Sequence, residues 1–346
     1  MKSLNTPLRA LIVVFCLCIV ASTPLVGEAG HVLAENLVVP ERGPAFDPLF
    51  PAALFQSYVA GMALVQEGRM VNVPTREEVR VQDDWSARLQ SVLLNNDILA
   101  LYGKPGARNM GILGQYSLSH LDSVMAPFIR MYDDANGIRG VIPSLYIIYG
   151  TVWPEGEIGI LSERVVREYI EYARERGWIV YLDHQIGKYT VEQAMNRLLP
   201  WLAYPNVHLA LDPEWRTTKP MKEIGSVTAS ELNTAQAMMQ DYLVEHRLPG
   251  RRMLVVHQFK PRMILDRPQV KSDYELVQII HCADGFGSPS VKRNAYAFNA
   301  LASNMPLKSF KLFLEPTIAG AGWDKPLMTP QEVFALDPRP YLIMYQ

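Results

Sequence analysis

Two carboxylates separated by one proline stand at the end of an apolar stretch of this sequence. The stretch reads VHLALDPEW from 207 to 215 and ends in Asp212, Pro213, Glu214 and Trp215. Side chains two apart in an extended chain share a face, so Asp212 and Glu214 should point the same way if Pro213 leaves the strand extended. Two close carboxylates cannot both ionise at low cost, so one would keep a proton near neutral pH. The spacing therefore predicts a proton donor for acid/base chemistry.

Seven further apolar runs also carry polar or ionisable residues at their carboxyl ends. The eight runs cover 97–103, 142–150, 178–185, 207–215, 252–259, 277–285, 309–316 and 340–346. The end residues of the other seven are Tyr102 and Lys104, Tyr149, Asp183 with His184 and Gln185, His257 and Gln258, His281 and Asp284, Glu315, and Tyr345 with Gln346. Carboxylates at four ends of one sheet are the strongest functional signal in the chain.

The runs themselves predict the elements that would hold these groups. Apolar runs with little polar alternation are typical of strands covered on both faces, as in a parallel sheet. Amphipathic segments alternate with them, which predicts parallel β-α units. Eight such units predict an α/β fold, a (β/α)8 TIM-type barrel over 93–346, with the active site at the carboxyl ends of its strands. An open doubly wound sheet is the alternative, but YGKPGARNMG after the first run lacks the G-x-G-x-x-G spacing of that fold.

Several helices have recognisable starts. Thr190 with Gln193, Thr228 with Glu231 and Thr329 with Glu332 have the spacing of capping boxes. Ser162 is placed to cap the helix that Gly177 would end. The segment after the fifth run has the weakest helical signal, because Pro261 and Pro268 interrupt it.

The first 29 residues read as a secretory signal peptide. Lys2 and Arg9 precede the apolar run ALIVVFCLCIVASTPLV, and the small residues of GEAG follow it. We expect export to the cell envelope or the medium, with an uncleaved membrane anchor as the alternative. Residues 30–92 are expected to form an N-terminal extension packed on the barrel. Cleavage near Ala29 would leave Cys282 as the one cysteine, so no intrachain disulfide is expected, and we interpret Cys282 as a buried thiol.

Composition excludes some partners. The chain of 346 residues has a formal net charge of −2, so nothing indicates nucleic-acid binding. No apolar run beyond the first segment approaches the length of a membrane span, so membrane contact is expected only through that segment if it is not cleaved. The sequence carries no signal of oligomeric state.

Glycoside hydrolysis fits these features best. It needs one carboxylic acid to protonate the leaving oxygen and a second carboxylate as nucleophile or base, and it needs no cofactor or metal. The predicted catalytic residues are Glu214, Asp212, Glu315 and Asp183. The predicted substrate-binding residues are Trp215, Tyr102, Tyr149, His184, Gln185, His257, Gln258 and Asp284. The expected partner is a carbohydrate, such as a cell-wall glycan.

The pattern resembles secreted barrel glycosidases in two ways. Many retaining barrel enzymes place an acid/base Glu after strand 4 and a nucleophilic Glu after strand 7, which would be Glu214 and Glu315, although Pro213 replaces their usual Asn. Asp212-Pro213-Glu214 is also similar to the Asp-x-Glu that closes strand 4 in barrel-type muramidases. That resemblance implies a supporting role for Asp284, but LYGK lacks the acid expected after strand 1. The whole chain resembles exported bacterial proteins.

Two other functions remain open at this stage. A metal-dependent hydrolase or isomerase would draw its ligands from the same strand ends, namely Asp183, His184, Asp212, Glu214, His257, His281 and Glu315. No H-x-H or H-E-x-x-H spacing supports it. The other is a barrel that binds a glycan without cleaving it.

Overall fold

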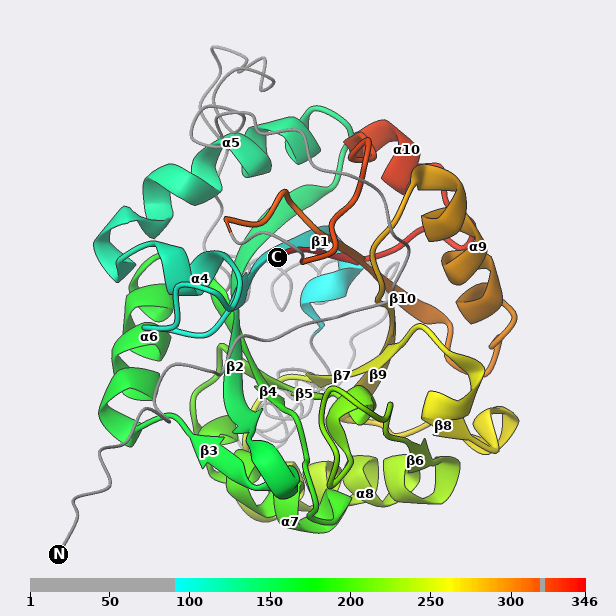
Figure 1. The fold of residues 1–346 in the computed structure, drawn as a ribbon. Coiled ribbons are helices and arrows are strands. Elements are labelled where there is room, and N and C mark those ends of the chain that lie inside the picture. The colour runs from blue at the N-terminus through cyan, green and yellow to red at the C-terminus, as the bar shows by residue number, and fades with distance from the viewer. Residues whose placement is uncertain (1–90, 318–320) are drawn as a thin grey trace, which may run out of the picture.

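The computed structural model describes residues 91–317 and 321–346, which form a closed parallel barrel (Figure 1). The predicted signal peptide and residues 30–90 of the predicted extension lie outside the described residues. The barrel strands are β1 (Asn96–Gly103), β2 (Gly140–Val152), β4 (Ile179–His184), β5 (Val207–Leu211), β7 (Arg252–Gln258), β9 (Val277–Ala283), β10 (Leu307–Leu312) and β11 (Leu342–Tyr345). Each pairs in parallel with the next, and β1 pairs with both β2 and β11. That last pairing closes the ring, so the predicted (β/α)8 barrel is confirmed and the open sheet is wrong.

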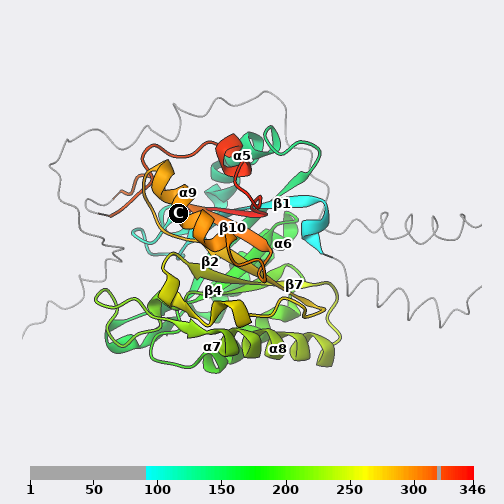
Figure 2. The same ribbon diagram turned by 90° about the vertical axis from the view of Figure 1, so that its right-hand side faces the viewer.

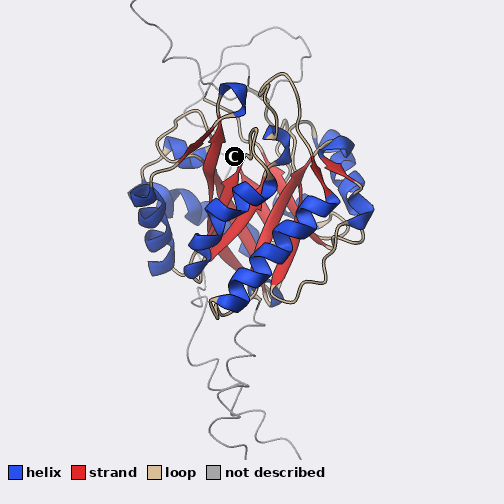
Figure 3. Ribbon diagram, turned by 90° about the horizontal axis from the view of Figure 1, so that it is seen from below, coloured by secondary structure: helices blue, strands red, loops and turns tan. Residues whose placement is uncertain are grey.

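Helices surround the strands in most of the connections (Figure 3). They are α4 (Ile112–Gln115), α5 (Leu121–Asp133), α6 (Glu163–Glu175), α7 (Val191–Leu198), α8 (Ala229–Glu245), α9 (Pro289–Ala300) and α10 (Pro330–Phe334). Seen from the side, α7 and α8 lie along one flank of the barrel and α5 on the opposite flank, while α9 lies on the side that faces the viewer (Figure 2). Among the described residues, no helix is long and apolar enough to cross a membrane.

Short elements fill the remaining connections. The strand β3 (Ile158–Ile160) pairs antiparallel with β2, and β6 (Val227–Thr228) pairs with β8 (Ile264–Leu265) outside the barrel. The 3-10 turns are η1 (Val92–Leu94), η2 (Leu118–His120), η3 (Pro154–Gly156), η4 (Leu199–Ala203), η5 (Pro213–Trp215), η6 (Pro261–Met263) and η7 (Arg267–Gln269). No α-helix forms between β7 and β9. Two prolines in that stretch remove backbone donors, so it folds as η6, β8 and η7 instead.

The predicted helix starts are present. Complete capping boxes begin α7 at Thr190, α8 at Thr228 and α10 at Thr329. Ser162 is the N-cap of α6, but its side chain makes no capping hydrogen bond. Gly177 follows that helix with a φ of 67°, a conformation that glycine adopts without strain.

Alternation along each strand divides the core into two layers. One face of every strand packs against the helices and contributes to the larger apolar cluster, which includes Leu182, Leu209 and Val256. The other face points into the barrel, where Tyr181, Ala210 and Val255 belong to a separate cluster. A one-residue shift therefore moves a side chain from the barrel interior to the helix-facing layer.

Candidate active site

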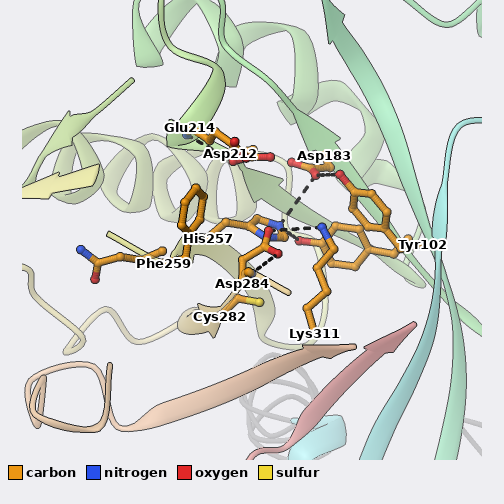
Figure 4. Close-up of polar contacts among 12 residues, drawn as sticks. Tyr102, Asp183, Asp212, Glu214, His257, Phe259, Cys282, Asp284 and Lys311 are labelled. Carbon is orange, nitrogen blue, oxygen red and sulfur yellow. Dashed lines mark hydrogen bonds and ion pairs between the residues drawn. The ribbon is translucent and has the colours of Figure 1, made fainter. Parts of the chain in front are cut away.

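Inward-facing side chains from seven strands meet at the carboxyl end of the barrel. They are Tyr102 on β1, Tyr146 on β2, Asp183 on β4, Asp212 after β5, His257 on β7, Asp284 after β9 and Lys311 on β10. Each is buried, with at most 6% of its surface exposed. Figure 4 labels all of these side chains except Tyr146 and shows the labelled ones converging, with Glu214 beside Asp212. This set is called the mouth cluster below.

A charged chain of three residues forms the base of the cluster. Nζ of Lys311 lies 3.2 Å from Oδ2 of Asp284, and the same oxygen lies 2.9 Å from Nδ1 of His257. The backbone N–H of Gly285 donates to the other oxygen of Asp284 at 2.8 Å. Burial by itself raises the pKa of Asp284, but Lys311, His257 and Gly285 together hold it well below its usual range. Asp284 is therefore a permanent anion between two cations.

His257 is a buried imidazolium. Burial lowers the pKa of its ring, but Cys282, Asp284 and Asp183 raise it well above its ordinary value. Its Nε2 lies 2.8 Å from the hydroxyl of Tyr146 and 3.7 Å from Oδ2 of Asp183. Both ring nitrogens thus face oxygen atoms, which suits the doubly protonated form.

Asp183 completes the network. The hydroxyl of Tyr102 donates to its Oδ2 at 3.1 Å. Burial raises the pKa of Asp183, whereas His257, Lys311 and Tyr102 oppose that rise. Its other oxygen, Oδ1, is buried and has no hydrogen-bond partner in the described part of the chain. Buried carboxylate oxygens are normally satisfied, so this atom is a candidate contact for a ligand.

Asp212 and Glu214 lie together, but not on an extended strand as predicted. The strand β5 ends at Leu211, and Pro213 to Trp215 form the turn η5. Asp212 caps that turn by accepting the N–H of Glu214 at 3.2 Å on Oδ1. Pro213 supplies no N–H for the ladder and suits the first position of such a turn, which explains the early end of the strand.

Both carboxyl groups of the pair hold their protons more tightly than usual. Burial, followed by the neighbouring carboxylates Asp183 and Asp284, raises the pKa of Asp212 to about 7, although His257 opposes the rise. Burial and the charge of Asp212 raise the pKa of Glu214 well above its usual value. The predicted elevation of a pKa at this pair is supported.

The balance of charges in the cluster also indicates that Asp212 and Glu214 keep their protons. Four carboxyl groups share the mouth with two cations, Lys311 and His257. The ion pairs of Asp284 with both cations favour its ionised form. Asp183 has a pKa raised by burial, but it accepts a hydrogen bond from Tyr102 and lies 3.7 Å from His257, and both contacts favour its ionised form. If Asp212 and Glu214 keep their protons, the cluster has no net charge, which is the least costly state in a region of low dielectric. Glu214 alone among the four carboxyl residues is partly exposed, so it is the group best placed to transfer a proton.

Four predicted substrate-binding residues lie outside the cluster. Tyr149 belongs to the helix-facing layer, and its hydroxyl donates to the carbonyl of Arg197 at 3.4 Å. His184 accepts the N–H of Ile186 at 2.9 Å on Nδ1. Oε1 of Gln258 contacts His281 at 2.8 Å, and Oε1 of Gln185 accepts the N–H of Val152 at 2.8 Å. Each of these four side chains is held by a structural contact.

Trp215 and Glu315 are two further predicted site residues that do not belong to the mouth cluster. Trp215 is buried at 6% exposure in the turn η5. Glu315 follows β10 by three residues and is exposed. It makes no ion pair or hydrogen bond with the mouth cluster among the described residues. Thus Tyr102, Asp183, Asp212, Glu214, His257 and Asp284 come together, while Glu315 does not join their contacts.

Two members of the cluster were absent from the sequence prediction. Lys311 lies within the apolar run SFKLFLEP and Tyr146 within IPSLYIIYG, and both precede the carboxyl ends of their runs. A lysine inside a strand otherwise apolar is itself a signal, because an unpaired ammonium is costly to bury. Tyr146 has no such signal, since aromatic residues are ordinary in strands.

The cluster does not have the form of a metal site. Among the described residues, no group of three or more His, Cys, Asp or Glu side chains is arranged to hold a metal ion. Lys311 and protonated His257 already supply positive charge to Asp284. A metal would have to compete with both, and it would need His257 to be neutral.

Comparison with known proteins identifies no family for this chain. The sequence matches no model of a known protein family and no curated protein sequence. Oxaloacetate acetylhydrolase with its product oxalate is similar at 12% identity and a TM-score of 0.42, over 73% of this chain and 77% of that chain. A group IV chitinase of Ostrinia furnacalis is 12% identical at a TM-score of 0.39, over 63% and 66%. An alpha-amylase of Lactobacillus plantarum is 11% identical at 0.35, over 65% and 64%. Such distant likenesses carry no functional argument, and the fold assignment rests on the strand pairing above.

Proposed function

We propose that this protein is an exported hydrolase that cleaves a glycosidic bond at the mouth of its barrel. Glu214 is the proton donor, and Asp212 is the carboxyl group that works beside it. The observation that carries the proposal is the adjacent pair of carboxyl groups with raised pKa values, one of them partly exposed, at the carboxyl ends of the strands.

The pair suits the first step of the reaction. A glycosidic oxygen is a poor leaving group unless an acid protonates it as the bond breaks. An ordinary glutamic acid has lost its proton at neutral pH, so a donor needs the raised pKa that burial and Asp212 give to Glu214. The proton leaves Glu214 for the glycosidic oxygen, and the resulting carboxylate can then accept a proton from the attacking water.

A carboxylate near the pair suits the second requirement of the reaction, which is stabilisation of the positive charge that develops on the sugar. The sugar develops positive charge as the bond breaks, and carboxylates stabilise that charge. Asp183, which lies beside Asp212 and whose Oδ1 has no hydrogen-bond partner among the described residues, is the carboxylate that we assign to this role. Lys311 and His257 keep this concentration of carboxyl groups compatible with a folded barrel.

The arrangement favours one of the two resemblances. The muramidase pattern uses Asp212, Glu214 and Asp284, and these three belong to or adjoin the mouth cluster. The retaining pattern instead needs Glu315, which is exposed and, within the described ranges, makes no hydrogen bond or ion pair with the other predicted catalytic residues. A cell-wall glycan is therefore the substrate class that we propose, and it agrees with the expected export signal.

A glycan screen with matched variants tests the proposal. The purified protein is incubated with a panel of glycans that includes peptidoglycan, and released reducing ends are measured. Cleavage should fall at least about a hundredfold in Glu214→Gln, the usual scale for loss of an acid/base group. Glu245→Gln, the same change at the exposed end of α8, should leave the rate unaltered.

Three other outcomes would contradict the proposal, and each would favour a different interpretation. Cleavage that survives Glu214→Gln would show that the assignment of the donor is wrong. Binding of a glycan without cleavage would favour the non-catalytic barrel. Loss of cleavage on treatment with a chelator, restored by zinc or manganese, would favour a metal-dependent hydrolase.

A further inference from the structure

A groove on the outer surface of the barrel lies apart from the mouth cluster. It has a volume of about 450 Å³. Side chains from α6, α7 and η4 and the residues next to them line it, including Glu163, Arg167, Arg197, Trp201 and Tyr204. Ligand pockets usually have volumes of about 300–1,000 Å³, so the groove has room for a small molecule. Its lining holds two guanidinium groups and one carboxylate, which leaves an excess of positive charge.

The two arginines differ in their partners. Arg167 is paired with Glu163 and contacts the hydroxyl of Tyr204. Arg197 pairs with no carboxylate in the described part of the chain. Its guanidinium carbon lies 4.5 Å from the ring centre of Tyr189. Among the described residues, the hydrogen-bond contact of the guanidinium group is with His184, with Nη1 3.4 Å from Nε2. The charge of Arg197 is thus available to the groove.

The protonation of His184 shows that this neighbour is not an acceptor. The backbone N–H of Ile186 can only donate, so Nδ1 of His184 must carry a lone pair. Burial and the charge of Arg197 lower the pKa of the ring to about 3, so it is neutral at pH 7. The single ring proton therefore sits on Nε2, the atom that faces Arg197.

Two donors consequently face each other across 3.4 Å. The buried N–H of His184 offers no lone pair to Arg197, and the guanidinium offers none in return. His184 is 0% exposed, so water does not relieve this contact on its inner side. The arrangement becomes favourable when an oxyanion on the groove side accepts hydrogen bonds from Arg197 and offsets the positive potential.

We infer that this groove binds a small organic oxyanion, a carboxylate or a phosphate ester, through Arg197. Arg167 lies at the same groove as a second, partly neutralised cation. Tyr204 and Pro200 provide an apolar wall for the rest of the ligand. The inference does not depend on the proposed hydrolysis, because no residue of the mouth cluster takes part.

Three probes of similar size separate charge from shape. Benzoate and phenyl phosphate carry the two candidate groups, and benzyl alcohol is the neutral control. Calorimetric titration of the full chain should give saturable binding of at least one anion and none of the alcohol. The preferred anion then tells a carboxylate ligand from a phosphate ester. NMR should show the Nε2–H signal of His184 shifting with the same saturation curve, because that proton lies beside Arg197.

Matched variants assign the binding to this groove. Arg197→Gln should weaken binding at least about tenfold, as expected for the loss of a charge-assisted hydrogen bond. Arg167→Gln should weaken it less, and Arg164→Gln, an exposed arginine paired with Glu168 on the same helix, should leave it within about twofold. Equal binding of the alcohol, unchanged binding in Arg197→Gln, or no saturation up to about 10 mM would each overturn the inference.

Discussion

Lys311 and Asp284 form an ion pair inside the barrel, with side-chain exposures of 4% and 7%. Lys311 lies on β10, and Asp284 directly follows the neighbouring strand β9. Asp284 also accepts a hydrogen bond from His257 of β7. Nζ of Lys311 also lies 3.9 Å from the ring centre of Tyr102 on β1. Tyr102 in turn donates a hydrogen bond to Asp183. Polar contacts therefore connect residues from five strands around the mouth of the barrel, so the charge state of one residue affects that of its neighbours.

Removal of the buried ammonium should destabilise the barrel. In Lys311→Met, Asp284 loses one of its two cationic partners while it stays buried. Breaking a buried pair from one side typically costs about 3–5 kcal/mol of unfolding free energy. Urea unfolding of the variant measures the loss. Lys325→Met, at an exposed lysine, should change the midpoint little, and an equal loss in both variants would contradict the assigned role of Lys311.

Stability should depend on pH through Asp212. The folded state keeps this proton up to about pH 7, whereas the unfolded chain releases it near its ordinary value of 3.8. Between these values the folded state binds more protons, so the free energy of unfolding falls as pH rises and levels off above about 7. The full span corresponds to at most about 4.5 kcal/mol, because each pKa unit is worth about 1.4 kcal/mol.

The variant Asp212→Asn isolates that dependence. It lacks the titrating group, so its stability relative to the unchanged protein should increase from pH 4 to pH 7 and then remain constant. Denaturation curves at several pH values measure the difference. A difference that is the same at pH 4 and pH 8 would contradict the raised pKa.

Loss of the Tyr102 hydroxyl should act on Asp183. In Tyr102→Phe, Oδ2 of Asp183 keeps only the more distant His257, so the pKa of Asp183 should rise further. We expect a stability loss of about 1–3 kcal/mol from the buried acceptor. If glycan cleavage is found, the acidic limb of its pH profile should move upward. Tyr341→Phe removes a hydroxyl with no hydrogen bond in the described part of the chain. It should change neither the stability nor the pH profile.

The capping box of α8 offers a test away from the site. Thr228 accepts the N–H of Glu231 at 3.2 Å, and Glu231 accepts the N–H of Thr228 at 2.8 Å. Thr228→Ala should lower the free energy of unfolding by about 1 kcal/mol, whereas Thr228→Ser, which keeps the hydroxyl, should lower it by less. Equal losses in both variants would show that the hydroxyl is not what stabilises this helix start.

Much of the fold could be predicted from the sequence, because the signals involved are local. Eight apolar runs predicted eight strands that the structure contains, and the three capping boxes begin helices at the predicted threonines. Prolines also acted locally, ending β5 before Pro213 and preventing an α-helix after β7. Such signals need only neighbours along the chain, so one sequence suffices to read them.

Whether a predicted residue belongs to the site depended on whether its side chain points into the barrel or toward the helices. Period-two alternation sorts a strand into two faces, but only barrel closure and register decide which face points inward. Thus Asp183 joins the mouth cluster while the adjacent His184 turns to the helices, and His257 and Gln258 divide in the same way. Lys311 and Tyr146 reach the cluster from inside their strands, whereas Glu315 lies beyond the end of β10 and remains exposed. The sequence alone determined that carboxyl groups gather at one end of the barrel. The tertiary structure decided which of them keep their protons, because that depends on burial and on distances between residues far apart in the chain.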